Sequence, residues 1–427
     1  MLKKARFTEL GLLGTAAITC LLALATVNLM QKGEITVEVL APGIVVIGLA
    51  LAIHLGLVAT GFEGDQVLFS IAVMLAGIGL ALVTRLAPEL ALKQTIWILI
   101  ALATLVGVLV FPRPVVWLKR YKYTFAVAGL LLVLATLAVG KDPNQSGARL
   151  WLSFAGITFQ PSELLKVLLA VFLAAYLDDK RELLSSGVYR LGPLRLPPLP
   201  YLAPLLIMWG VSVVVLFGQR DLGPTFLLFG VFVAMLYVTS SRAVYVWSGL
   251  GLFAIAFVLA VRFIRHAAVR VDIWLNPWND PQGQGYQLVQ SLVAIASGGL
   301  LGTGLGRGHP DLIPAVFTDF PFAALAEETG MIGALGILAI YLTLTYRGLR
   351  IAIDAREGFQ RLLAVALATV LGLQTLIIVG GNLRMIPLTG ITLPFVSYGG
   401  SSLFANFLIV GLLLRISHEN CRREHAS

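Results

Sequence analysis

Three carboxylates lie in the stretch "FTDFPFAALAEETG", residues 317–330, which is otherwise apolar. Asp319 comes just before an apolar run, and Glu327 and Glu328 lie two turns into it. A carboxylate in a site shielded from water can have its pKa raised towards neutrality and can then act as a general base. An aspartate just before a helix also serves as an ordinary cap. Composition and spacing leave both interpretations of Asp319 open.

A second pair of charges opens another apolar run. Within "GARLWLSFAGITFQPSELLK", Pro161 suits the first turn of a helix, so that Glu163 lies in this turn and Lys166 lies on the same face three residues later. Ionisable side chains inside a membrane are costly, and their default interpretation is functional. The alternative is that Glu163 caps the helix while Lys166 extends its ammonium group outward. The residues alone leave the two equally open.

Three further segments are polar or irregular. Asp221, in "GQRDLGPTFLL", is by itself best explained as an N-cap. The segment "SGGLLGTGLGRG", residues 297–308, fails the GxGxxG spacing and follows no strand, so we expect a flexible loop whose amides help to hold an anion. Residues 380–402 are too rich in Gly and Pro for a helix and too apolar for a free loop. Irregular backbone near membrane depth persists only when it is buried in protein or lines a cavity. We therefore expect this segment to wall a cavity, with the following polar groups available: Asn382, Arg384, Ser397, Tyr398, Ser401 and Ser402.

The composition indicates a polytopic membrane protein. Of the 427 residues, 58% are hydrophobic and only 12% are charged, whereas roughly a quarter are charged in soluble domains. A helix needs about 20 apolar residues to cross a bilayer, which predicts an all-α fold with about twelve membrane helices. The runs lie near residues 10–30, 40–60, 67–86, 95–111, 123–140, 161–177, 200–217, 222–240, 243–262, 331–346, 362–380 and 402–415.

The positive charges predict the orientation in the membrane. Most of the 31 Lys and Arg residues fall in the loops on the same side as the N-terminus, so both termini are expected in the cytoplasm. The longest connection, residues 263–330 between the ninth and tenth helices, is then outside. The net charge of +9 is spread over these loops, which argues against nucleic-acid binding. Six arginines on the outer side would fit an anionic ligand, although solvated loop charges are the alternative: Arg149, Arg262, Arg265, Arg270, Arg307 and Arg384.

Five segments together resemble the SEDS family of bacterial shape, elongation, division and sporulation proteins (RodA, FtsW and SpoVE). They are "GARLWLSFAGITFQPSELLK", "QRDLG", "NPWNDPQGQGYQLVQSLVAIASGGLLGTGLG", "TDFPFAALAEETG" and "GNLRMIPLTGITLPFVSYGGSS". The resemblance covers residues 67–427 and implies a ten-helix core, which leaves residues 1–66 as a two-helix N-terminal extension. The stretches "RGLRIA" and "LIPAVFTDF" favour a RodA-like member.

The resemblance implies a peptidoglycan glycosyltransferase that polymerises lipid II at the outer face of the bacterial cytoplasmic membrane. It also implies a class B penicillin-binding protein as the transpeptidase partner. Asp319 matches the proposed catalytic aspartate and would act as the general base of an inverting transfer. Substrate binding is expected from Lys166, Glu163, Asp221, Gln160, Arg149, Arg270, Arg384, Ser397 and Ser401. The chain departs from the family pattern where Phe317 replaces the usual His, where Leu150 replaces the frequent Arg before Trp, and where Arg220 replaces a Pro.

A divalent cation, Mg²⁺ or Mn²⁺, would help to neutralise the departing pyrophosphate, although the sequence contains no dedicated metal motif. Two alternatives remain open. A flippase or transporter for lipid-linked precursors suits the number of spans and the broken segment. A non-catalytic scaffold would need no buried lysine and carboxylate set.

Overall fold

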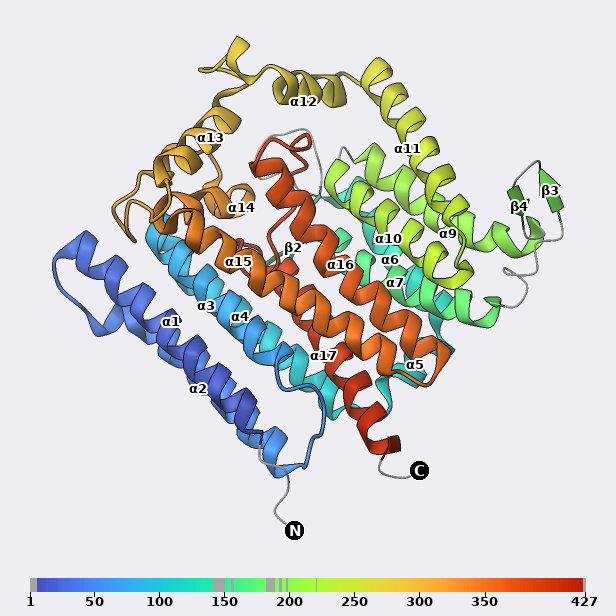
Figure 1. Ribbon diagram of the computed structural model, residues 1–427, viewed down its shortest axis with the longest axis horizontal. Helices are drawn as coiled ribbons and strands as arrows, with labels where there is room; N and C mark the ends of the chain where they lie inside the picture. Colours follow the sequence, from blue (N-terminus) through green and yellow to red (C-terminus); the bar gives the residue numbers. More distant parts are fainter. Residues whose placement is uncertain are drawn as a thin grey trace. The chain divides into compact units, whose positions relative to one another are not determined.

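The computed structural model describes residues 6–140, 150–154, 157–181, 189–191, 194–196, 199–219 and 221–424. These residues form helices with two short antiparallel hairpins, drawn in Figure 1. The chain divides into two compact units. One consists of Met1–Phe111, Asp272–Arg347 and Gln374–Ser427, and the other of Pro112–Val271 and Gly348–Leu373.

The first unit contains the N-terminal helices, most of the long connection and the C-terminal helix. Its elements are α1 (Phe7–Lys32), α2 (Val37–Ala59), α3 (Leu68–Leu86), α4 (Pro88–Val110), η1 (Pro277–Asn279), α13 (Tyr286–Gly298), η2 (Pro310–Leu312), α14 (Val316–Asp319), most of α15 (Pro321–Asp354), the end of α16 (Gly358–Asn382) and α17 (Gly400–Glu424). The connection that was predicted as a loop over residues 263–330 is therefore largely helical. Short turns separate these helices.

The second unit contains the middle of the chain. Its elements are α5 (Pro114–Arg120), α6 (Lys122–Val139), β1 (Leu152–Phe154), β2 (Ile157–Phe159), α7 (Pro161–Asp179), β3 (Tyr189–Leu191), β4 (Leu194–Leu196), α9 (Leu199–Gly218), α10 (Leu222–Ser240), α11 (Ala243–Phe263) and most of α12 (Arg265–Leu275). The strands pair β1 with β2 and β3 with β4. The all-α prediction missed these hairpins because each strand has only three residues, too few for a visible period of two.

Each of the predicted apolar runs coincides with a helix, and the polytopic helical fold is confirmed. Within the described residues, ten helices are long and apolar enough to cross a membrane. The two predicted spans outside this set are α7, which carries Glu163 and Lys166, and α9, whose apolar part is the shorter helix Leu206–Leu216. Membrane crossing by α7 and α9 therefore stays a prediction.

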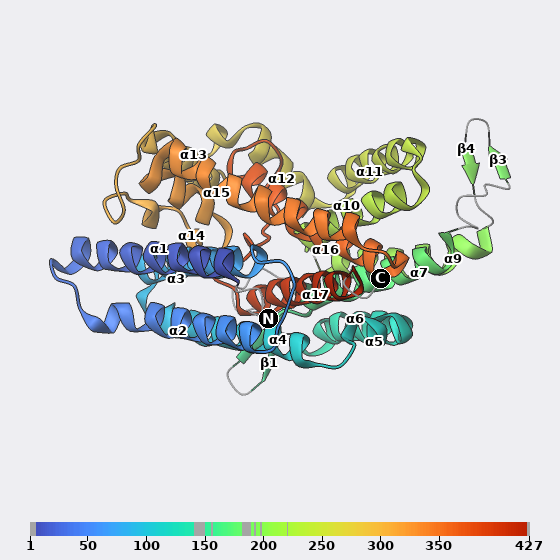
Figure 2. The ribbon, with the colours of Figure 1, turned by 60° about the horizontal axis from the view of Figure 1, so that its bottom comes forward.

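Small residues allow α1 to pack closely on its neighbours. It lies along both α3 and α2 (Figures 1 and 2). A Cβ on Gly43 of α2 would meet the Leu24 side chain at 2.7 Å, and one on Gly77 of α3 would meet Cys20 Cβ at 2.9 Å. Close approach at small side chains is a common way for helices to associate in lipid, because lipid provides little hydrophobic driving force. Cys20 is thus a buried packing residue.

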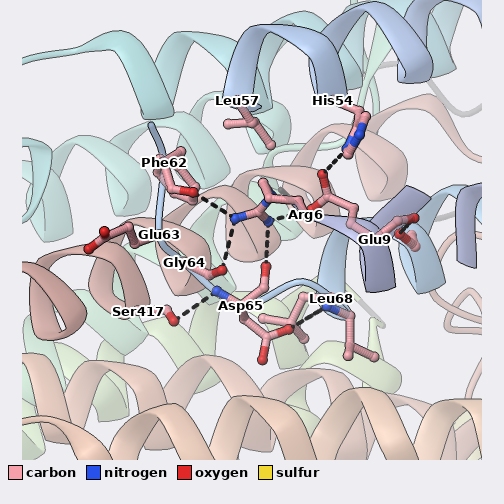
Figure 3. Close-up of polar contacts among 12 residues, drawn as sticks. Arg6, Glu9, His54, Leu57, Phe62, Glu63, Gly64, Asp65, Leu68 and Ser417 are labelled. Atoms are coloured by element: carbon pink, nitrogen blue, oxygen red, sulfur yellow. Dashed lines mark hydrogen bonds and ion pairs between the residues drawn. The ribbon is translucent and has the colours of Figure 1, made fainter. Parts of the chain in front are cut away.

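Arg6 fastens the start of α1 to the turn before α3 (Figure 3). Its guanidinium donates to three backbone carbonyls, those of Phe62 at 3.0 Å, Gly64 at 2.9 Å and Asp65 at 2.9 Å. It also pairs with the Glu9 carboxylate, which is fully buried. A planar guanidinium with several donors suits such a set of acceptors.

Glu9 and Asp65 extend this buried cluster to other helices. Glu9 Oε1 lies 2.6 Å from His54 Nδ1 on α2. Asp65 Oδ1 accepts from the backbone N–H of Leu68 at the start of α3, and its Oδ2 pairs with Arg347 of α15. The N–H of Asp65 donates to Ser417 Oγ of α17 at 3.0 Å (Figure 3). The N-terminal helices are therefore held to this unit by buried polar contacts as well as by apolar packing.

Replacing Glu9 tests this attachment. Glu9→Ala leaves Arg6 and His54 buried without their carboxylate, and breaking a buried ion pair costs about 3–5 kcal/mol. We expect a lower melting temperature for the detergent-purified protein. The matched control Glu34→Ala changes an exposed glutamate in the turn between α1 and α2 and should melt with the wild type. Equal melting of Glu9→Ala and wild type would contradict the role of the cluster.

Candidate active site

Lys166 and Glu163 form a buried ion pair at the start of α7. Lys166 Nζ lies 2.6 Å from Glu163 Oε2, and the side chains are 3% and 8% exposed. Pro161 is in the first turn of the helix, as predicted, and this places the two charges on one face. The alternative that Lys166 extends outward is wrong, because its ammonium is buried and paired.

Asp221 lies beside this pair in the same unit. It occupies the N-cap position of α10, yet its side chain makes no cap hydrogen bond. Instead, its Oδ2 accepts from Gln160 Nε2 at 3.3 Å and from Ser162 Oγ at 3.4 Å. Interpreting Asp221 as an ordinary cap is therefore wrong. The carboxylate turns towards the residues that lead into α7.

The surroundings of Asp221 favour its protonated form. Burial, and next the negative charge of Glu163, raise the pKa of Asp221 to about 7, while Arg270 and the two hydrogen bonds act in the opposite direction. Five predicted site residues are thus brought together in one unit: Gln160, Glu163, Lys166, Asp221 and Arg270. Arg149 lies outside the described residues.

Asp319 lies in the other unit, where its backbone is held by the end of α16 and the segment after it. Three successive carbonyls, those of residues 317–319, each accept a hydrogen bond from this region. Tyr398 N–H donates to Phe317 at 2.8 Å, Ser397 Oγ donates to Thr318 at 2.7 Å, and Asn382 Nδ2 donates to Asp319 at 2.9 Å. Asp319 itself is partly exposed. A partly exposed carboxylate on a fixed backbone suits a group that must meet a substrate.

The segment between α16 and α17 is irregular, as predicted, and its second half, residues 391–399, is largely buried in protein. Phe395 adopts a left-handed φ of 67°, Tyr341 donates to Pro394 O at 2.6 Å, and Gln374 Nε2 donates to Thr392 O at 2.8 Å. These bonds satisfy backbone carbonyls that no helix pairs. That the segment walls a cavity stays a prediction.

The contacts of Arg384 and the burial of Ser401 are typical of residues that stabilise the fold. The Arg384 guanidinium donates to the carbonyls of Trp274 at 2.8 Å and Leu275 at 2.5 Å, and Trp274 Nε1 donates back to Arg384 O at 3.0 Å. Arg384 thereby ties the irregular segment to the end of α12. Ser401 is buried in the first turn of α17. Substrate binding by either residue stays a prediction.

Asn382, which holds the Asp319 carbonyl, is not among the residues that the sequence predicts for the site, where it is only one of the available polar groups. The signal for it in the sequence is its place at the end of an apolar helix, directly before the irregular segment. Phe317, which replaces the usual His, packs its ring edge-on against Tyr398 with centroids 5.9 Å apart. This position therefore contributes apolar packing beside Asp319.

The two glutamates that follow Asp319 in the chain, Glu327 and Glu328, have hydrogen-bond partners within the protein. Glu327 Oε1 accepts from His309 N–H at 2.9 Å, and Glu328 Oε1 accepts from Arg85 Nε of α3 at 3.3 Å. The segment 297–308 was expected to be flexible with amides free for an anion. Its amides at Thr303 and Gly304 instead donate to carbonyls of α15, at 3.0 Å each.

Comparison with known proteins places these features in a family context. The family model FTSW_RODA_SPOVE, described as cell cycle protein, matches residues 66–422. The peptidoglycan glycosyltransferase RodA of Mycobacterium tuberculosis is 39% identical over 97% of this chain and 90% of that protein. The fold is similar to that of Thermus thermophilus RodA, with a TM-score of 0.61 and 27% identity over 84% of this chain and 97% of that one. A chain from a peptidoglycan synthase complex, studied for the coordination of polymerization and crosslinking, gives a TM-score of 0.68 and 27% identity over 84% of this chain and 98% of that one.

The contacts that hold Asp319 can be tested through stability. Ser397→Ala removes the donor to Thr318 O and the acceptor of Leu393 N–H, at 2.7 Å each. Each buried group left unpaired costs about 1–3 kcal/mol. Thermal unfolding in detergent should show a lower midpoint for this variant. Ser297→Ala, at an exposed serine with a local bond to Ala294 O, should not change it. Equal midpoints for both variants would exclude the role given to Ser397.

Proposed function

The chain belongs to the FtsW/RodA/SpoVE family, and on this premise we propose that it is a peptidoglycan glycosyltransferase that polymerises lipid II, with Asp319 as the general base. The observation that carries the reaction is the match over 97% of the chain to relatives named as peptidoglycan glycosyltransferases. The choice of base is supported by the three hydrogen bonds that fix the backbone of residues 317–319.

The proposed reaction is an inverting displacement. The Asp319 carboxylate takes the proton of the acceptor sugar hydroxyl, and the hydroxyl oxygen forms a bond to the anomeric carbon of the donor. The bond from this carbon to the pyrophosphate oxygen breaks, and its electron pair leaves with the lipid-linked pyrophosphate. The Lys166 ammonium, with Arg270 and Arg149, neutralises that charge.

We also propose that a divalent cation assists the departure of the pyrophosphate. Among the described residues, no group of three or more His, Cys, Asp or Glu side chains could hold a metal by itself. Mg²⁺ commonly binds through one or two carboxylates together with substrate phosphates. Glu163 and Asp221, two buried carboxylates of one unit, fit that mode. The ion would supply charge neutralisation at the phosphates.

The proposed placement in the membrane has twelve helices, both termini in the cytoplasm and residues 263–330 outside. It rests on the distribution of Lys and Arg. Reporter fusions after α6, α11 and α17 test this topology, and a cytoplasmic signal from the end of α11 would contradict it.

The proposed partner is a class B penicillin-binding protein. It is supported by the similarity to a chain of a complex that couples polymerization and crosslinking.

The flippase alternative has one structural argument, since broken helices are typical of transporters. α15 is interrupted at Gly330, with φ 68° and ψ −172°. In transporters, the backbone groups freed by such a break coordinate a substrate or ion. Here the N–H groups of Met331 and Ile332 donate instead to carbonyls of the protein's own residues 299 and 300. The break therefore supports an enzyme with a fixed site better than a transporter.

Asp319→Asn tests the general base. Loss of such a base typically lowers a rate by about 10²–10⁴-fold, and we expect this loss in lipid II polymerisation by the purified protein. Asp311→Asn, at an exposed aspartate of the same connection, is the matched control and should polymerise at the wild-type rate. A wild-type rate for Asp319→Asn would contradict the assignment.

The same assay tests the other parts of the proposal. EDTA should stop polymerisation, and added Mg²⁺ or Mn²⁺ should restore it. Full activity in EDTA would contradict the proposed role of the cation. Adding the penicillin-binding protein should yield crosslinked product from the glycan strands. Translocation of lipid II in proteoliposomes without polymer would favour the flippase.

A double variant separates the proposed catalytic role of Lys166 from its structural role in the ion pair with Glu163. Lys166→Met alone leaves the Glu163 carboxylate buried and unpaired, which destabilises the protein. Adding Glu163→Gln removes that charge and should restore the melting temperature. We expect the double variant still to lose about 10²–10³-fold in polymerisation, as when a charge-stabilising donor is removed from other active sites. A stable double variant with full activity would show that the ion pair is only structural.

A further inference from the structure

α15 is hydrogen-bonded to the glycine-rich segment at the break before Met331. We call this set of backbone hydrogen bonds, between residues 299–304 and residues 327–332, the splice. In an uninterrupted helix, the N–H groups of residues 331 and 332 donate to the carbonyls of residues 327 and 328. Here both of those bonds are replaced. Thr303 N–H donates to Glu327 O and Gly304 N–H to Glu328 O, each at 3.0 Å, while Met331 N–H donates to Gly299 O at 2.9 Å and Ile332 N–H to Leu300 O at 3.2 Å. The inserted segment thus takes the place of one missing helical turn.

Two glycines make this splice possible. Gly302 and Gly330 both have left-handed backbones, with φ of 82° and 68°. A Cβ on Gly302 would lie 2.2 Å from Glu328 O and 2.6 Å from Gly330 N, and one on Gly330 would lie 2.3 Å from Gly302 N. These neighbours are backbone atoms, so no side-chain movement relieves the clash. Any larger residue must push the segment and the helix apart.

Side chains hold the same junction from outside. Arg85 of α3 donates through Nε to Glu328 Oε1 at 3.3 Å and through Nη2 to Gly308 O at 3.0 Å. His309 N–H donates to Glu327 Oε1 at 2.9 Å. Both glutamates are more than nine-tenths buried. The junction is therefore a rigid point in the fold.

The junction lies at one end of the short helical piece, residues 321–329, and Asp319 lies just beyond the other end. Phe320 and Phe322, both almost fully buried, anchor that far end. The piece cannot slide without breaking the splice or moving these rings. We propose that the splice positions Asp319 for proton transfer and that Gly302 and Gly330 are positioning residues. This inference rests on the proposed function, in which Asp319 is the base.

Gly302→Ala tests the proposal through kinetics. A displacement of about 1 Å at a reacting group can cost 10²-fold in rate. We expect kcat for lipid II polymerisation to fall about 10–100-fold while KM changes less than about threefold, because the substrate contacts remain. Two controls separate this effect from general strain. Gly33→Ala places alanine at φ 75° with open space around it, and Gly336→Ala places it in α15 beyond the break, also with open space. Both should keep the wild-type kcat.

A double-variant cycle distinguishes positioning from a structural effect. If the splice acts through Asp319, Gly302→Ala should add no further loss to the residual rate of Asp319→Asn. An equal fold-loss in both backgrounds, or a wild-type kcat for Gly302→Ala, would overturn the proposal.

Should Gly302→Ala fail to fold, Thr303→Val replaces it under the same criteria. It keeps the shape and removes only the Thr303 Oγ1 bond to Glu327 O, at 3.2 Å, with an expected kcat loss of about threefold. Full activity of Asp319→Asn would instead refute the proposed base, whatever Gly302→Ala does.

Discussion

Backbone groups that leave a helix inside an apolar protein must find new partners, and this requirement shapes the region around Asp319. Two such sets of backbone groups lie at this residue and shortly after it in the chain. The break at Gly330 is satisfied by residues 299–304, and the carbonyls of residues 317–319 are satisfied by side chains and backbone of residues 382–398. Because every such bond has a definite direction, these pairings define where Asp319 lies. The same bonds that stabilise irregular backbone also hold a reactive group in place.

Buried charges follow a parallel rule, since an ion removed from water needs a partner. Two clusters obey it with different consequences. Arg6, Glu9 and His54 pair with one another and with the turn before α3, so their role is to hold the N-terminal helices. Lys166 and Glu163 also pair, but they lie beside Asp221, and burial raises the pKa of that carboxyl to about 7.

The glycine-rich segment shows why a local pattern can mislead. Its sequence suggested free amides and flexibility, and both expectations were reasonable for an isolated loop. In the folded protein the amides of Thr303 and Gly304 are used by α15, and Gly302 is required because backbone atoms of Glu328 and Gly330 approach it closely. Glycine serves here for close approach as well as for its left-handed φ. The nearby arginine, Arg85, holds the junction from a helix more than two hundred residues earlier.

The sequence by itself determined the helical membrane fold, the apolar runs, the placement of Glu163 and Lys166 on one face of a helix, and the irregular character of residues 380–402. These features depend on composition and on spacings of three or four residues, which act locally. Only the tertiary structure decided that Asp221 turns away from its own helix, that Asn382 holds the Asp319 carbonyl, and that residues 299–304 complete α15. These outcomes join segments far apart in the chain, and the choice among many possible donors and acceptors is made by packing, which no local pattern records.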